Sequence, residues 1–330
     1  MRRFRLALVA LVVTASGVWT LAQTPPPQAP PAGRQGGQAA GQAAGAAGAA
    51  GARQGGARGG GRGARTRKVV LAWADTRNGI AQHDSVSHAL AIIERLGYES
   101  GLWDTFIRTD SNIVSKTPLK TDGTPASGGP NLGMADAIFY MGHRDVPLDA
   151  KQKEDLLSFV KDDGKGFVAA HVALTSLESW PEFGELLGAR FDGHPLTGPG
   201  TVINEDPAFP AVKHFPASFP FSDEFYQPKE YSRDKMDVLL RLDLSKQAPG
   251  NASLHANGDY PLAWAKMYGK GRVFYGSFAH DAKTWDIRDV QQMYFEAIKW
   301  ALGMTDAPVA GHPMRGAALP EGGRGGGGGR

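Results

Sequence analysis

The 330-residue sequence contains no cysteine. This absence excludes disulfides, thiolate metal ligands and cysteine nucleophiles together. A P-loop is also missing. The triplet Gly-Lys-Gly occurs at 164–166 and 269–271, but neither copy has the P-loop spacing of glycine, lysine and hydroxyl residue. Nucleotide binding through such a loop is therefore not expected.

Acidic residues are absent from positions 1–68, which hold ten lysines and arginines. Positions 304–330 hold three arginines against Asp306 and Glu321. The remaining stretch, 69–303, carries 23 basic and 31 acidic residues, a net charge of −8. An acidic folded part is a poor candidate for binding polyanions, so no nucleic-acid partner is predicted.

The first 22 residues have the layout of a secretory signal peptide, with three early arginines, an apolar run over 6–13, and small or neutral residues before a cut at Gln23. The run is shorter than the roughly 20 residues of a membrane span, so no stable span is expected after cleavage. Without cysteine, a lipoprotein anchor is excluded. The sequence predicts export, to the periplasm or outside the cell.

Residues 23–67 consist of proline, glutamine, glycine, alanine and arginine in simple patterns. Such a segment has too little apolar surface to offset the entropy of ordering, which predicts a disordered spacer. Its Arg-Gly character also resembles RNA-binding tails, an alternative that suits an exported protein poorly. Residues 304–330, ending in EGGRGGGGGR, are predicted to form a second flexible tail, leaving one folded domain over 68–303.

Within that domain, apolar strands alternate with amphipathic helices, which predicts an α/β fold with a doubly wound, mainly parallel sheet. Asp84 and Asp149 are predicted N-caps, Gly97 is predicted to end the first helix, and Pro181 to interrupt or restart another. The expected strands are 68–75, 98–104, 136–142, 166–171 and 236–243, with a hairpin over 261–280 that turns at its Gly-Lys-Gly triplet; the expected helices are 83–97, 148–164, 176–188 and 289–303.

Seven motifs follow one another along the domain: QHDSV, GKGFVAAH, LLGARFDGHP, SDEFYQ, YSRDKMDVLLRLD, PLAWAKMYGKGRVFYGSFAH and IKWALG. In this order they resemble the ThuA-like family, named for trehalose utilisation, over residues 68–303. The resemblance implies a class I glutamine amidotransferase-like fold, close to the flavodoxin-like sheet. It also implies a link to sugar metabolism, with disaccharides or their keto derivatives as small-molecule substrates.

In amidotransferases of this fold, the strand matching GFVAAH leads into a sharp turn that bears a nucleophilic cysteine. Here the comparable position is close to His171. Because the chain has no cysteine, glutamine hydrolysis by a thiol is excluded.

Candidate site residues lie at strand ends or in the adjoining loops: His83, His171, His194, Glu224 and His280. Parallel strands place their carboxyl ends on one rim, so His83 and His171 are expected to approach each other, and His280 joins them if its strand runs the same way. Imidazoles with a carboxylate can bind a divalent metal, for which His171 and His194 are the predicted ligands. They can equally supply acid, base and hydrogen bonds to a sugar, with Asp223 and Tyr226 as substrate-binding residues.

Each of these side chains also has a structural interpretation. His83 can belong to the loop that caps the first helix, His171 can be a buried histidine bonded to a carbonyl, and His194 can close the turn at Gly193 and Pro195. The remaining alternatives are a solvated acidic pair for Asp223 and Glu224 and simple packing for Tyr226. Ala279, where relatives tend to carry glycine, is more restrictive in the turn before His280.

Three functions are compatible with these observations. The first is an exported carbohydrate-active enzyme, a hydrolase or lyase with metal or histidine acid–base assistance. The second is a sugar-binding or accessory module that uses the same residues for hydrogen bonding alone. The third is an interaction scaffold built on the two flexible ends.

Overall fold

The computed structural model describes residues 67–246 and 253–315. The predicted signal peptide, nearly all of the predicted spacer and the glycine-rich end after residue 315 lie outside the described residues. None of the described helices is long and apolar enough to cross a membrane.

A nine-stranded sheet forms the centre of the described domain, in the order β2-β1-β3-β4-β11-β10-β9-β6-β7. The strands from β2 to β11 in this order run parallel, and β10, β9, β6 and β7 continue the sheet in antiparallel pairs. This matches the predicted α/β fold with a mainly parallel sheet. The bounds are β1 Lys68–Trp73, β2 Trp103–Arg108, β3 Ala137–Tyr140, β4 Gly166–Ala170, β6 Leu196–Asn204, β7 Ser218–Phe225, β9 Asp237–Leu242, β10 Pro261–Tyr268 and β11 Gly271–Gly276. A separate two-stranded sheet pairs β5 Arg190–Phe191 with β8 Pro228–Lys229.

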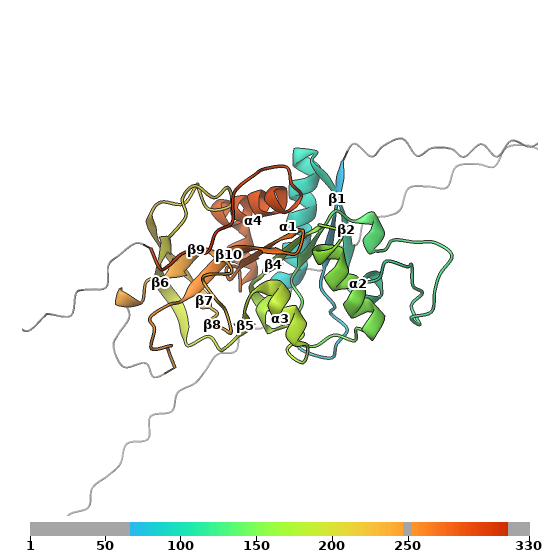
Figure 1. The fold of residues 1–330 in the computed structure, drawn as a ribbon, viewed down its shortest axis with the longest axis horizontal. Coiled ribbons are helices and arrows are strands. Elements are labelled where there is room, and N and C mark those ends of the chain that lie inside the picture. The colour runs from blue at the N-terminus through green and yellow to red at the C-terminus, as the bar shows by residue number, and fades with distance from the viewer. Residues whose placement is uncertain (1–66, 247–252, 316–330) are drawn as a thin grey trace, which may run out of the picture. The chain divides into compact units, whose positions relative to one another are not determined.

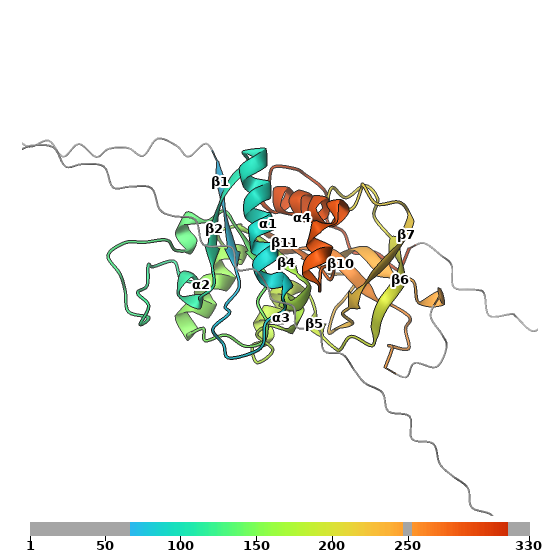
Figure 2. The ribbon, with the colours of Figure 1, turned by 180° about the vertical axis from the view of Figure 1, so that it is seen from behind.

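Helices cover both faces of the parallel part of the sheet. Figure 1 shows α2 (Ala150–Lys161) and α3 (Pro181–Leu187) on one face, and Figure 2 shows α1 (Ser85–Ser100) and α4 (Arg288–Ala301) on the other. Side chains alternate along β1, so that Val70 and Ala72 pack in the layer under α1 and α4, while Val69 and Leu71 pack under α2 and α3. Burial on both faces explains why these strands are almost continuously apolar.

The first helix differs from its prediction at both ends. Asp84 stands at the N-cap position, but its carboxylate accepts a hydrogen bond from the backbone of Ala282 and makes no cap bond. The helix continues past Gly97 to Ser100 and ends at Gly101, whose φ of 70° is left-handed. Gly97 is required for packing instead, because a Cβ there would lie 2.3 Å from the indole nitrogen of Trp103.

The second strand, predicted over 98–104, instead runs over Trp103–Arg108, because α1 occupies the chain up to Ser100; the boundaries that follow agree with their predictions. Asp149 and Gln152 form a reciprocal capping box at the start of α2, and Pro181 begins α3. The β10–β11 hairpin turns at the Gly-Lys-Gly triplet, where Gly269 has a φ of 60°. The segment after α4 differs from the prediction: residues 304–315 contact the domain, and His312 is buried, its imidazole 3.0 Å from Asp237.

Candidate functional site

The candidate site lies where the parallel strands β1, β4 and β11 end. His171 follows β4 directly, and His83 and His280 lie in the segments after β1 and β11. Because β11 pairs parallel with β4, the condition for His280 to join the other histidines is met.

Three side-chain atoms form a compact triangle at the centre of the site. His171 Nε2 lies 3.1 Å from His280 Nδ1 and 3.6 Å from Glu224 Oε2. The third side, between His280 Nδ1 and Glu224 Oε2, measures 3.0 Å. Two imidazoles and a carboxylate from distant parts of the sequence thus point at one another.

His171 is held by its backbone conformation, by a hydrogen bond at Nδ1 and by packing of its ring against Tyr226. Its φ of 38° falls in the left-handed region, at the start of the 3₁₀ helix His171–Thr175. Its Nδ1 lies 2.7 Å from the carbonyl oxygen of Ser277, and the ring of Tyr226 packs 4.1 Å away. Because a carbonyl only accepts, Nδ1 carries the proton and, in the neutral ring, Nε2 directs its lone pair at the triangle.

Glu224 reaches the triangle from the antiparallel strand β7. Its second oxygen, Oε1, lies 3.2 Å from Nδ1 of His194, whose side chain is half exposed. Burial favours the neutral carboxyl, but the attraction of the neighbouring imidazoles of His171, His280 and His194 outweighs it and lowers the pKa of Glu224 to about 2. Glu224 is therefore a carboxylate at every physiological pH.

His83 stands beside the triangle, its ring centroid 4.8 Å from that of His280 and 5.5 Å from that of His171. Burial is the main cause that lowers the pKa of His83 to about 4, and repulsion from His171, His280 and His143 lowers it further. The negative charge of Glu224 acts in the opposite direction. His143 packs its ring edge-on against His83, with ring centroids 5.0 Å apart. The sequence analysis gave His143 no role, although its place just after β3, another parallel strand, was a usable signal.

Asp223, predicted to bind substrate, turns away from the triangle and holds the segment after β11. Its carboxylate accepts hydrogen bonds from the backbone N–H groups of Ala279, His280 and Glu224. Burial raises the pKa of Asp223, and these hydrogen bonds together with the charge of His171 oppose the rise. Ala279 has a φ of 87°, so the predicted strain of alanine in this turn is present. Asp223 therefore positions His280.

Four side chains can hold a metal ion together: His83, His171, Glu224 and His280 offer ligand atoms within 4.8 Å of one another. Of the two predicted ligands, His171 belongs to this group and His194 does not. His194 instead pairs with the far oxygen of Glu224 at the exposed side of the site.

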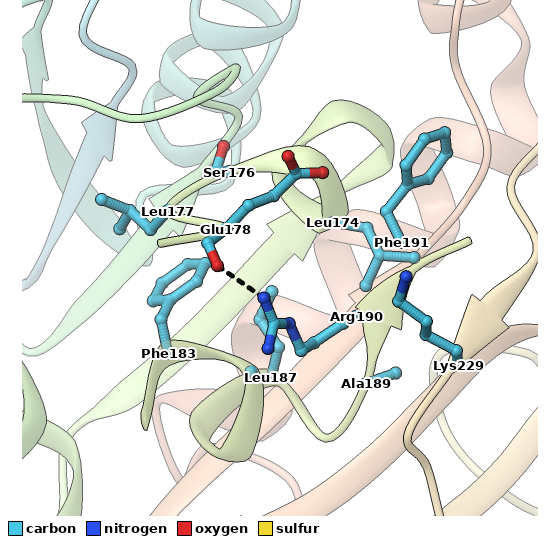
Figure 3. A pocket seen from close by; sticks show the side chains of 11 residues that line it. Leu174, Ser176, Leu177, Glu178, Phe183, Leu187, Ala189, Arg190, Phe191 and Lys229 are labelled. Carbon is cyan, nitrogen blue, oxygen red and sulfur yellow. Dashed lines mark hydrogen bonds between the residues drawn. The ribbon is translucent and has the colours of Figure 1, made fainter. Parts of the chain in front are cut away.

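Tyr226 packs against His171 and forms one wall of the site. A cavity of about 180 Å³ lies beside α3 (Figure 3). The ring of Phe191, which lines this cavity, packs 4.7 Å from that of Tyr226. The cations that line it are already engaged, because Arg190 pairs with Glu230 and donates to the backbone of Glu178, and Lys229 pairs with Asp192. Phe191 thus supports Tyr226, and neither Arg190 nor Lys229 brings an unpaired positive charge to the site.

The fold is class I glutamine amidotransferase-like, and the sequence has no cysteine that could serve as the thiol nucleophile of the amidotransferases. The model of the ThuA family, described as trehalose utilisation, matches residues 69–301, and the chain belongs to this family. A comparison with curated proteins gives no match.

Two solved structures share the fold. A ThuA-like protein from Bacteroides uniformis is 20% identical with a TM-score of 0.55, the alignment covering 71% of this chain and 91% of that one. Another from Parabacteroides merdae is 15% identical with a TM-score of 0.54, covering 75% of this chain and 98% of that one. Both are described as putative ThuA-like proteins.

Proposed function

We propose that the protein is an exported carbohydrate-active enzyme that acts on a disaccharide or keto-sugar derivative, with a divalent metal ion bound by His83, His171, Glu224 and His280. The family's link to trehalose utilisation supports a sugar substrate. The arginine-led apolar pattern of residues 1–22 supports export.

The observation that carries the proposal is the triangle of His171, His280 and Glu224. A zinc ion with ligands at about 2.0–2.2 Å holds its tetrahedral ligands about 3.3–3.6 Å apart, and an octahedral ion with similar bonds holds adjacent ligands about 3 Å apart. The sides of 3.0, 3.1 and 3.6 Å fall in this range. The carbonyl of Ser277 fixes the ring of His171 in the tautomer that ligation needs, the usual outer contact of a metal-bound histidine.

Each residue has a chemical task in this proposal. A bound metal ion would polarise a sugar oxygen or a bound water. Glu224 supplies the negative charge of the site, and His194, half exposed beside the outer oxygen of Glu224, is placed to exchange a proton with the substrate. Burial, reinforced by Glu224, raises the pKa of Tyr226, so its hydroxyl stays protonated at neutral pH and can donate to a sugar oxygen.

The test uses full-length protein treated with a chelator and then titrated with zinc, manganese and magnesium by calorimetry. Product analysis on a disaccharide and on its oxidised keto form is run in parallel, with and without the metal that binds. His171→Gln keeps the size of the side chain but removes the ligand nitrogen, and we expect it to fold normally and to lose at least about tenfold in metal affinity or turnover.

His88→Gln is the matched control, because His88 is a partly exposed histidine on α1 that pairs with Asp286, away from the triangle. It should bind metal and turn over substrate like the unchanged protein. Sugar binding without product from either substrate would favour the non-catalytic module. Turnover that survives complete metal removal would contradict the proposed role of the metal ion and would favour acid–base catalysis by the histidines alone.

A further inference from the structure

A second cavity is lined in part by His83. It has a volume of about 330 Å³ and lies between the ends of β1 and β2 and the first turns of α1. The volume is in the range of small-molecule pockets and is large enough for a six-membered ring or a short alkyl chain. The residues that line it are Thr76, Gln82, His83, Val86, Ser87, Leu90, Ile107 and Thr109.

His83 connects this cavity to the triangle. It lines the cavity, and its ring also stands 4.8 Å from the ring of His280. A molecule whose sugar sits at the triangle can therefore extend past a single imidazole into the cavity.

The chemistry of the walls favours an apolar occupant. Val86 and Leu90 from α1 and Ile107 from β2 supply hydrocarbon, and Ile107 is 43% exposed, unusual for so large an apolar side chain. Thr76, Ser87 and Thr109 also line the cavity, but hydroxyls of a second sugar ring that face the three apolar side chains would lack hydrogen-bond partners, which is costly.

One polar atom in the lining lacks a partner. Gln82 donates its amide to Asn78 and to the backbone of Ile80, while its Oε1 is buried and has no hydrogen-bond partner among the described residues. Because this oxygen is buried, it offers a hydrogen-bond acceptor to a ligand hydroxyl only if the Gln82 side chain rotates toward the cavity.

We infer that this cavity binds the apolar aglycone of a glycoside, an alkyl or aryl group, while the sugar occupies the site at His171, Glu224 and His280. The inference rests on the proposed function, since it assumes that a sugar binds there. It adds glycosides with an apolar aglycone as a substrate class for the same site, beside the disaccharide or keto-sugar derivative of the proposed function.

The experiment measures binding of methyl, propyl, butyl and hexyl glucosides to the full-length protein by calorimetry, below their micellar concentrations. Each methylene that enters the cavity should tighten binding about fourfold until the cavity is full. Ile107→Asn should flatten this dependence on chain length, and Ile107→Trp, which fills the cavity with a ring, should also abolish it.

Ile80→Asn is the matched control, because Ile80 is 45% exposed in the neighbouring loop but does not line the cavity. Ile80→Asn should keep the full dependence of binding affinity on alkyl chain length. Thermal unfolding of all three variants shows whether each is folded. Equal affinity for all chain lengths in the unchanged protein would overturn the inference, as would an unchanged dependence in both Ile107 variants. If only the proposed function fails, the chain-length dependence persists although no glucoside is turned over and no metal binds.

Discussion

At the scale of single residues, two residues of the candidate site have strained, left-handed backbone conformations. His171 and Ala279 have φ values of 38° and 87°, a region that side chains other than glycine adopt at a cost of about 1–3 kcal/mol each. The contact of His171 with the Ser277 carbonyl and the bond from Ala279 to Asp223 hold these conformations in place. Such strain is concentrated at functional sites, which supports assigning the function to this rim.

The adjacent carboxylates Asp223 and Glu224 should respond differently to neutralisation. Asp223→Asn places an amide NH₂ against backbone N–H donors, and we expect it to lower the free energy of unfolding by about 1–3 kcal/mol. Glu224→Gln should unfold at nearly the same denaturant concentration as the unchanged protein and instead lose metal affinity. Urea unfolding and metal titration of both variants check this. Equal loss of stability in the two would mean that Glu224 is also structural.

At the scale of elements, strand β10 carries a lysine, Lys266, whose charged form is destabilised by burial. Burial lowers the pKa of Lys266 to about 8, with help from Lys235 and against the charge of Glu185, and its ammonium donates to the backbone of Glu185. Since the folded pKa is below the unfolded value, the unfolded chain binds more protons between pH 8 and the usual value near 10.5. The charge therefore costs stability in full below pH 8, and this cost disappears as the pH rises toward 10.5.

Lys266→Met should accordingly raise the free energy of unfolding at pH 7 by roughly 1–2 kcal/mol, less than the shift in pKa implies because a hydrogen bond is lost. The gain should shrink toward pH 10. Lys270→Met, at the exposed turn of the same hairpin, is the control and should change little. A gain from Lys266→Met that is the same at pH 7 and pH 10 would show that it comes from packing rather than from charge.

At the scale of the whole molecule, the segment after α4 completes the antiparallel side of the sheet. His312 Nε2 lies 3.0 Å from Asp237, and the backbone N–H of Arg315 donates to Glu205. Glu205 is fully buried and also pairs with Arg233. These contacts place partners for two buried carboxylates in a stretch whose composition alone predicts a flexible tail.

Ending the chain after residue 305 should therefore cost roughly 3 kcal/mol of stability relative to a chain that ends after residue 316, because buried carboxylates lose their partners. Thermal and urea unfolding of the two chains measure the difference. Identical midpoints would show that residues 306–316 contribute no packing, as their composition predicts.

The sequence by itself determined the family, the α/β fold and most elements of the parallel half. These elements can be predicted without long-range information. A strand buried on both faces is continuously apolar, and a helix buried on one face has apolar residues at the helical period, so both patterns are visible in the local sequence. For the same reason the strand-end positions of His83, His171 and His280 could be predicted, since parallel strands share one rim.

Only the tertiary structure decided which side chains meet. Glu224 comes from the antiparallel strand β7, which is not a neighbour of β4 or β11 in the sheet, so its 3.0 Å approach to His280 depends on how the whole sheet folds over. His143 packs its ring against His83, and His194 contacts the far oxygen of Glu224 instead of joining the four-residue group; spacing along the chain encodes neither contact. Long-range contacts of this kind arise from packing of the whole domain, and a sequence pattern read locally cannot fix them.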